Sequence, residues 1–553
     1  MEEVEDCHRE EIQFQEFLAF GKTDKLSKMT TEQSNYSKKR KHLKYGNSTD
    51  LKMSEFQKIE NIEKDDTKNH KNGTNNSPND HKKLKHVLRK KVFETRNSTL
   101  TDLFNEIKHV KTIYNFFVAL FLIAFLNTAV YDILQNGSLS LGFFTIKLGF
   151  GKMTTVIKMW CFMEASSYSV YYFYNFYAHQ RIKLSPKSFQ LKIWDYTWFL
   201  LFVAYQLTFL VLPAHITLKS QLPPPSATIV LMEQVRMIMK IHAFVRSTVP
   251  SVLNRKLNDG SGDLIPKFNK FSYFMFAPTL IYQDNYPRTE KIRWRVATKY
   301  FLEAVFAILF VSLMFERYVL PAYKDFGREP FNLHTFSSRI ISTTLPGTII
   351  YLCGFYCLLH AWMNGCAELT RFGDRLFYQD WWTSVSYGKY YRTWNIVVYD
   401  WLYTYIYRDF YEKLFPGNKL IATFSVFFTS AVVHEYILAC VFRFFYPVMF
   451  LFFGVFGFVL VLITKKESSA IGNIFLWFSL ITGSGMMVSF YTMEYFARLN
   501  CPGLKDEFLD SFVPRSWLCY DRFSGGNGEN HLVLYISTLS FLTLFTLLYK
   551  KFG

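Results

Sequence analysis

Long uncharged stretches alternate with short polar segments along most of this chain. Each stretch has about 20 residues, and an α-helix of that length spans the roughly 30 Å hydrocarbon layer of a bilayer. One stretch, 226–248, carries charges at helical spacing and would also suit a helix lying at the membrane surface. However, the loop at 250–299 is basic and therefore expected in the cytosol, which requires that 226–248 cross the membrane. The predicted crossings are 112–134, 155–177, 196–218, 226–248, 300–320, 340–367, 420–442, 444–464, 471–496 and 532–549. We therefore expect an all-α, polytopic transmembrane protein.

Basic residues gather in particular loops and predict the orientation of the chain. A cluster from Lys82 to Arg96 precedes the first stretch, so the N-terminus is expected in the cytosol, and ten crossings return the C-terminus there. The last residues, Lys550-Lys551-Phe552-Gly553, are typical of a dilysine retrieval signal for the endoplasmic reticulum. Ordinary basic flanking of a last span is the alternative. The pattern predicts a multi-pass protein of the endoplasmic reticulum membrane.

The first 108 residues are rich in Lys, Asn, Asp and Ser and show almost no periodic apolar pattern. Such a segment cannot bury a core, so we expect a largely disordered cytosolic arm. Apolar residues among the charges at 82–96 predict a short basic amphipathic segment, a plausible contact for assembly. The net charge of +18 resides mostly in this arm and in the loops, which favours membrane topology over nucleic-acid binding as its explanation.

The eight cysteines divide by their surroundings. Four lie in apolar runs and are predicted to be small core residues, whereas Cys501 and Cys519 flank a polar loop that the topology places in the oxidising lumen, where they can form a disulfide. No Cys/His spacing suggests a metal site, so no metal is expected.

Two histidines lie inside predicted membrane helices, His434 in 420–442 and His360 in 340–367. Ionisable residues are costly at that depth and usually mark a reaction or transport path, but a histidine also serves as a hydrogen-bonding residue between packed helices. His434 is the first candidate for chemistry. Glu435, about 100° away from it on an ideal helix, is expected to give structural support.

Between the two central spans stand Phe377-Tyr378-Gln379-Asp380-Trp381-Trp382 and then Arg392-Thr393-Trp394-Asn395, with His434 about forty residues further on. This constellation resembles the membrane-bound O-acyltransferase superfamily, specifically its sterol O-acyltransferase branch, whose motif is FYxDWWN. Further similarity lies in 232–246, 276–289 and 514–519, and the resemblance covers roughly residues 85 to 523. The chain departs from the branch pattern at Thr383, Lys389 and Tyr399.

The resemblance implies a transmembrane catalytic domain at 109–523, built around an intramembrane reaction chamber. Members of this branch typically have nine spans, so the apolar run in 524–553, with its dilysine-like tail, is expected to be an additional C-terminal span outside the resemblance. It implies transfer of a long-chain fatty acyl group from acyl-CoA, a substrate and not a cofactor, to the 3β-hydroxyl of a sterol drawn from the bilayer. His434 would be the general base and Asn395 a hydrogen-bond donor to the thioester carbonyl. Matching positions for acyl-CoA binding are Arg392, Asn395, Tyr407, Lys419 and Ser430. No further cofactor is implied.

Other features remain open at this stage. His360 is expected either in a sterol site or in packing, and members of the family assemble as homo-oligomers. The neighbouring diacylglycerol acyltransferase branch, or another lipid-alcohol acyltransferase, is the alternative enzyme, and a non-enzymatic sterol-binding membrane protein is the third hypothesis. At 1.5 Å per residue His434 would lie about 20 Å from the cytosolic start of its helix. The charged coenzyme A would therefore stay at the cytosolic mouth while the acyl chain reaches inward.

Overall fold

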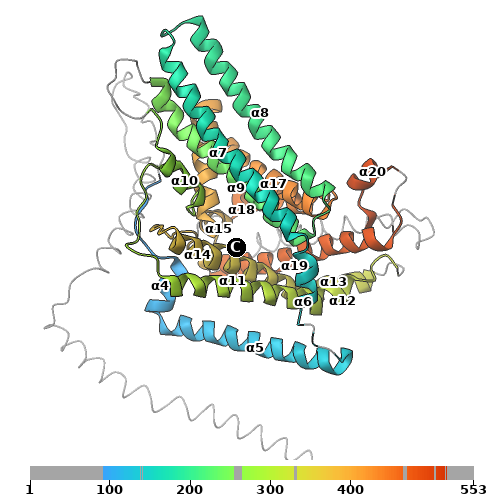
Figure 1. Cartoon of the computed structure of the whole chain (residues 1–553). Coiled ribbons are helices and arrows are strands. Elements are labelled where there is room, and N and C mark those ends of the chain that lie inside the picture. Colours follow the sequence, from blue (N-terminus) through green and yellow to red (C-terminus); the bar gives the residue numbers. More distant parts are fainter. Residues whose placement is uncertain are drawn as a thin grey trace, which may run out of the picture. The chain divides into compact units, whose positions relative to one another are not determined.

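The computed structural model describes residues 91–137, 139, 141–254, 264–328, 333–464, 470–503, 506–516 and 519. The described part is helical, with two isolated β-bridges and no longer strand, so the all-α prediction is confirmed (Figure 1). Its elements are α4 (Thr99–Glu106), α5 (Lys108–Asn136), α6 (Phe143–Gly149), α7 (Met153–Lys183), α8 (Phe189–Lys219), α9 (Pro224–Asn254), α10 (Phe268–Phe276), α11 (Trp294–Met314), η1 (Phe315–Val319), α12 (Leu320–Tyr323), α13 (Leu333–Phe355), η2 (Tyr356–Trp362), α14 (Met363–Leu369), η3 (Trp381–Thr383), α15 (Tyr387–Trp394), α16 (Ile396–Leu402), η4 (Tyr403–Tyr407), η5 (Phe410–Leu414), α17 (Lys419–Phe442), η6 (Phe450–Phe456), α18 (Gly457–Ile463), α19 (Ala470–Asn500) and α20 (Glu507–Phe512).

Helices occupy every predicted crossing before residue 500. Within the described residues, six helical stretches are long and apolar enough to cross a membrane. They are Lys108–Gln135, Phe189–Lys219, Trp294–Tyr323, His334–Leu369, Lys419–Phe442 and Ala470–Asn500. Helices α7 and α9 are each 31 residues long but more polar, and the apolar helix Phe450–Ile463 is shorter. The predicted tenth span, 532–549, lies outside the described residues.

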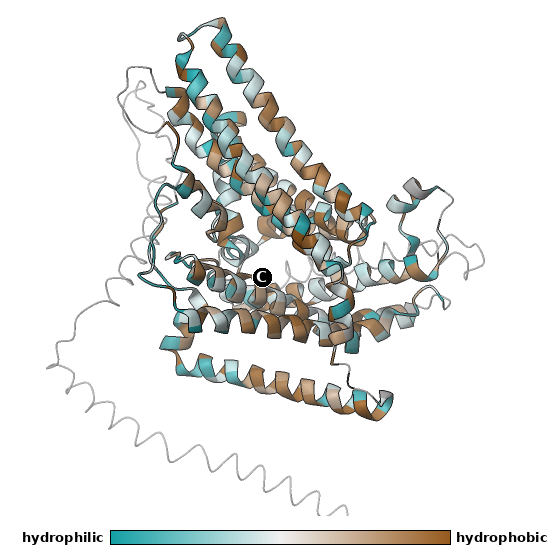
Figure 2. Ribbon diagram, in the orientation of Figure 1, coloured by the Kyte–Doolittle hydropathy of each residue, from teal (hydrophilic) through white to brown (hydrophobic). Residues whose placement is uncertain are grey.

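Apolar side chains cover the outer surface of several spans. Figure 2 shows hydrophobic residues along the middle of α5, and Phe117, Ile123 and Leu126 on that helix are each 63% exposed. A soluble protein would bury such residues, whereas lipid solvates them without cost. This surface supports a membrane-spanning assignment for α5.

Close backbone approach joins α13 to α19. A Cβ atom on Gly347 would lie 2.9 Å from the Cα of Gly485, so only glycine fits at this crossing. Thr343 Oγ1 and Ser489 Oγ then hydrogen-bond at 2.7 Å across the same interface. Small residues with hydroxyl pairs are the usual means of packing helices in a membrane, where burial of apolar surface contributes little.

Charged side chains of α9 make contacts within the protein. Glu233 bonds Arg236 on the same helix and accepts from the indole of Trp160 at 2.9 Å. The Lys240 ammonium is 1% exposed and donates to the carbonyls of Phe274 and Ala277 at the C-terminal end of α10. Because buried charges are tolerated only when they are paired or hydrogen-bonded, these contacts explain how so polar a helix packs in the interior.

The end of the predicted arm, residues 91–106, has defined structure in this protein. Residues 91–98 are extended, apart from a bridge at Arg96, and α4 follows at Thr99–Glu106. Order here comes from backbone pairing with residues 373–375 and from the ring of Phe93, contacts that the sequence pattern does not reveal. The rest of the arm, including 82–90 of the predicted amphipathic segment, lies outside the described residues.

At the other end of the spans, Cys501 and Cys519 form a disulfide with a Cα–Cα distance of 6.0 Å. Beside it the carboxylate of Glu494, 0% exposed, accepts from the guanidinium of Arg498 and from the backbone N–H groups of Arg515 and Ser516. The end of α19 is therefore tied to the segment that follows α20. The predicted cysteine pairing is confirmed.

Candidate active site

His434 lies on α17, whose first turn is capped by Asn418 through a hydrogen bond from Ile421 N. Its Nδ1 is 2.7 Å from the carbonyl oxygen of Ser430, one turn earlier on the same helix. A carbonyl oxygen only accepts, so Nδ1 carries the proton. In a neutral imidazole the other ring nitrogen, Nε2, then holds the lone pair and is the atom that can accept a proton.

His434 is exposed, whereas its helix neighbours Ala431 and Glu435 are buried. The outward apolar stripe of α17 runs through Phe428 and Val432, and Val432 points about 200° away from His434 on an ideal helix. The accessible surface of His434 therefore does not belong to that stripe.

Glu435 holds the start of η6, the helix that packs against His434. Its Oε2 accepts from Phe450 N at 3.0 Å, and the hydroxyl of Tyr491 donates to the same carboxylate while accepting from Met449 N at 3.1 Å. These bonds hold the first turn of η6. Phe453 lies three residues further along, with its ring centroid 5.2 Å from that of His434.

Asn395 is the N-cap of α16. Its Oδ1 accepts from Val398 N at 3.1 Å, which sets the orientation of the amide and leaves the Nδ2 hydrogens as its remaining donors. Backbone bonds from Ile396 N to Phe377 O and from Gln379 N to Thr393 O join this turn to the aromatic motif. The motif therefore holds Asn395 in place through the backbone.

The aromatic motif is mostly interior. Phe377, Tyr378 and Trp381 are 1%, 0% and 2% exposed, and the Trp381 ring packs 4.7 Å from that of Trp394. Such burial indicates a scaffold and not an interfacial aromatic belt, which would be partly exposed.

The polar end of the motif behaves differently. Asp380 is half exposed and accepts from the Thr383 hydroxyl at 2.7 Å, with the Lys389 ammonium 3.6 Å away. Thr383 thus hydrogen-bonds within its own turn. The carbonyl of Trp382 accepts from Asn473 and Trp477 on α19.

Tyr391 connects the motif to the histidine. Its ring lies 4.9 Å from that of Phe427 on α17 and 5.4 Å from that of Phe453 on η6, which in turn contacts His434. A Cβ on Gly457 would collide with the Tyr391 hydroxyl, so glycine is needed there. Sequence reasoning missed Tyr391 and Phe453 because both stand in aromatic-rich runs that single out no member.

His360 is 2% exposed and lies in η2, a π-helical turn. Its Nδ1 is 2.6 Å from the hydroxyl of Tyr378, and its ring meets those of Phe104 and Tyr300 edge-on. These contacts account for packing against the aromatic motif. A role at a sterol site stays a prediction.

The remaining candidates for acyl-CoA binding are spread over three elements. Arg392 on α15 and Lys419 at the start of α17 are exposed, whereas Ser430 is 9% exposed beside His434. Tyr407 belongs to a stacked column of tyrosines at four-residue spacing, with ring centroids 5.3 to 6.0 Å apart. The column comprises Tyr399, Tyr403, Tyr407 and Tyr411.

Tyr399 lies nearest to Arg392 in this column. Burial raises the pKa of Tyr399 to about 12, so its phenol stays protonated, although Arg392 acts in the opposite direction. In the part of the chain that the structure describes, no hydrogen bond or ion pair joins Arg392, Tyr407 or Lys419 to one another or to His434. No cluster of three or more His, Cys, Asp or Glu residues suited to a metal ion occurs there either.

Known proteins resemble this chain over most of its length. Residues 76–493 match MBOAT, the membrane-bound O-acyltransferase family. The chain is 42% identical over 435 residues to sterol O-acyltransferase 1 of Mus musculus, covering 78% of this chain and 79% of that protein. It is 37% identical over 436 residues to sterol O-acyltransferase 2 of Homo sapiens, covering 78% and 81%. The chain therefore belongs to the membrane-bound O-acyltransferase family.

Proposed function

We propose that this protein is an acyl-CoA:sterol O-acyltransferase in which His434 is the general base. One observation carries the role of His434: its Nδ1 donates to the Ser430 carbonyl, which leaves Nε2 of this exposed residue as the proton acceptor. The sterol as acceptor rests on the names of the relatives. The reaction yields a steryl ester and CoA.

The residues divide the chemistry as follows. The 3β-oxygen of the sterol attacks the thioester carbonyl carbon while Nε2 of His434 takes the hydroxyl proton. The carbonyl oxygen becomes an oxyanion, to which the Nδ2 group of Asn395 donates a hydrogen bond. Collapse breaks the carbon–sulfur bond, and the proton passes from His434 to sulfur, so that CoA leaves as a thiol.

Cationic side chains at the cytosolic mouth suit the phosphates of coenzyme A. Arg392 and Lys419 are exposed, as such a role requires, and Tyr407 offers part of a ring stack. Ser430 lies on the His434 face of α17, where the acyl end would pass. Acyl-CoA is thus a substrate bound across the cytosolic boundary.

The direct test replaces His434 with alanine in the purified full-length protein and measures transfer from labelled oleoyl-CoA to cholesterol. We expect esterification to disappear while thermal unfolding is unchanged. His179→Ala is the matched control, because His179 makes the same Nδ1 contact, 2.9 Å, to a carbonyl one turn earlier but lies elsewhere, on α7. Wild-type activity in His434→Ala would refute the mechanism.

Acceptor choice needs its own assay. Cholesterol and diacylglycerol compete for one labelled acyl-CoA pool, and we expect the steryl ester to dominate. Preference for diacylglycerol would move the protein to the neighbouring branch of the family. Binding of sterol without any acyl transfer would make it a sterol-binding protein.

We further propose residence in the endoplasmic reticulum membrane as a homo-oligomer with both termini in the cytosol. The basic cluster before α5 and the terminal Lys550-Lys551 support this orientation. A tag after Gly553 should be accessible in cells whose plasma membrane alone is permeabilised. Protection of the tag would remove the tenth crossing, and cross-linking in membranes measures the oligomer.

A further inference from the structure

Residues 91–98, which we name the N-terminal strap, run alongside the segment that leads into the aromatic motif. Arg96 N donates to Gly373 O at 3.0 Å, and Arg375 N donates to Arg96 O at 3.1 Å. On its other side, Gly373 N donates to Pro287 O at 2.8 Å. Three segments far apart in sequence are thereby joined through their backbones.

Side chains fasten the strap further. Arg96 forms a bidentate pair with Asp374, at 2.7 and 3.1 Å, and the ring of Phe93 packs 5.1 Å from that of Tyr286. Ser98 is 0% exposed and receives a hydrogen bond from Asn364 on α14. A bidentate guanidinium–carboxylate pair and a buried polar contact make this attachment more than a surface encounter.

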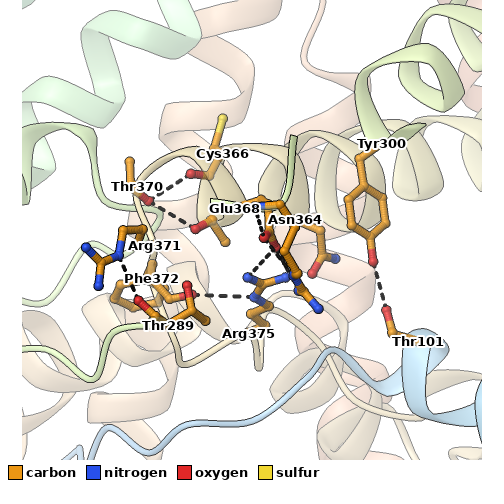
Figure 3. A network of polar contacts seen from close by, with 12 residues as sticks. Thr101, Thr289, Tyr300, Asn364, Cys366, Glu368, Thr370, Arg371, Phe372 and Arg375 are labelled. Atoms are coloured by element: carbon orange, nitrogen blue, oxygen red, sulfur yellow. Dashed lines mark hydrogen bonds and ion pairs between the residues drawn. The ribbon is translucent and has the colours of Figure 1, made fainter. Parts of the chain in front are cut away.

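The segment under the strap is itself rigidly held, as Figure 3 shows. Glu368, fully buried on α14, pairs with Arg375 at 2.6 Å and with Arg293 at 2.8 Å. Nearby, the Arg371 guanidinium donates to the carbonyl of Thr289 at 2.7 Å. The strap is therefore attached to a fixed support.

At its first residue, Lys91, the strap contacts α16. The Lys91 ammonium lies 2.7 Å from Asp400, and both side chains are mostly buried, at 17% and 20% exposure. Asp400 is on α16, the seven-residue helix whose N-cap is Asn395. By comparison, the Lys389–Asp380 pair is longer, 3.6 Å, and its side chains are 41% and 48% exposed.

We propose that Lys91 and Asp400 are positioning residues of the acyl-CoA site, an inference that rests on the proposed function. The pair fixes one end of α16 to the strap, and the orientation of α16 sets that of the Asn395 amide. Lys91 also offsets a negative charge close to Tyr399 and Arg392, where the phosphates of coenzyme A would bind. Small displacements of a positioning group are known to cost large factors in rate.

The two charges predict different kinetic effects. Lys91→Gln loosens α16 and removes a cation that offsets Asp400, so kcat should fall and KM for oleoyl-CoA should rise, each about 3- to 10-fold. Asp400→Asn loosens α16 but also removes the negative charge, so kcat should fall while KM for oleoyl-CoA stays near wild type. Neither should change KM for cholesterol. The rise in KM for Lys91→Gln should shrink at high salt, which screens the repulsion.

The experiment uses full-length protein with both substrates and compares these variants with the double variant and with Lys91→Arg. The double variant should have a kcat no lower than that of either single variant, because the same interaction is lost in each case. Lys91→Arg keeps the positive charge and should retain most of the wild-type activity. Lys413→Gln, which removes an exposed cation on η5, is the matched control and should be silent.

Wild-type kcat and KM in Lys91→Gln would overturn the inference, as would a double variant whose loss is the product of the single losses. A shift in KM for cholesterol alone would also overturn it. If the wild-type protein proves inactive on sterols, the proposed function fails by itself. Equilibrium binding of a non-hydrolysable oleoyl-CoA analogue then tests the inference. Weaker binding by Lys91→Gln than by the wild-type protein is required, and unchanged binding would refute it.

Discussion

Replacing Glu435 with alanine tests whether the carboxylate beside His434, the proposed general base, supports structure or takes part in chemistry. Glu435 is 4% exposed and accepts the N–H of Phe450, the first residue of η6, as well as the hydroxyl of Tyr491. Alanine leaves the buried N–H of Phe450 without an acceptor, which costs about 1–3 kcal/mol. Tyr491 keeps its bond from Met449 N and contributes less to the loss.

The consequence for activity follows from Phe453. Loosening the first turn of η6 displaces the ring that packs 5.2 Å from His434, so the imidazole loses a wall of its site. If about 1.4 kcal/mol of the cost appears as misplacement of His434, kcat falls about tenfold. We therefore expect Glu435→Ala to show both a lower unfolding temperature and a kcat reduced about 3- to 30-fold, with KM for cholesterol little changed.

Glu435→Gln is the control, because a glutamine keeps an oxygen acceptor for Phe450 N without a charge. We expect its kcat to stay within about twofold of wild type, since the amide oxygen still accepts the N–H of Phe450. The assays are initial rates with oleoyl-CoA and cholesterol, together with thermal unfolding in the same detergent. Wild-type behaviour of Glu435→Ala would refute the supporting role, and a glutamine variant as impaired as the alanine variant would show that the charge itself participates.

Three further outcomes are expected. Gly485→Ala should lower the unfolding temperature, because the new Cβ would collide with the backbone of Thr344 across the α13–α19 crossing, at a cost of about 1–3 kcal/mol. Gly483→Ala is the matched control, because a Cβ on Gly483 would meet nothing within 4 Å. Cys501→Ser removes the disulfide that closes a loop of 18 residues and should lower the free energy of unfolding by about 3 kcal/mol. Thermal unfolding with and without reductant measures this loss, and an unchanged transition would contradict it. Tyr378→Phe removes the hydroxyl that contacts His360, so the free energy of unfolding should fall by about 1–3 kcal/mol while kcat stays within about threefold of wild type. A larger loss of kcat would indicate that His360 takes part in the reaction.

Helix positions were accessible from the sequence because about 20 uncharged residues in a row leave a membrane helix as the favoured structure. The polar helix α9 was harder, since its charges also suit an interfacial helix. Its partners decide the matter, because Lys240 donates hydrogen bonds to carbonyls at the C-terminal end of α10, a contact between residues more than thirty positions apart.

Some features of the candidate site could not be read from local patterns. Residues 91–98 have the composition of a disordered arm, and their structure comes from contacts with distant residues, such as that of Arg96 with Asp374, 278 positions away. Phe453 is one of several phenylalanines in its run, and only the packing of η6 against α17 distinguishes it. Only the fold brings Lys91 beside Asp400, because the two residues lie far apart in the sequence.

The sequence by itself determined the all-helical membrane architecture, the cysteine pair, and the motif that points to Asn395 and His434. Those features depend on composition, on spacing along one helix, or on a short run of residues. Only the tertiary structure decided which ring nitrogen of His434 is free, which atom of Asn395 can donate, and which distant residues hold both in place. The physical reason is that hydrogen-bond direction and close packing depend on three-dimensional neighbours, which a one-dimensional pattern does not specify.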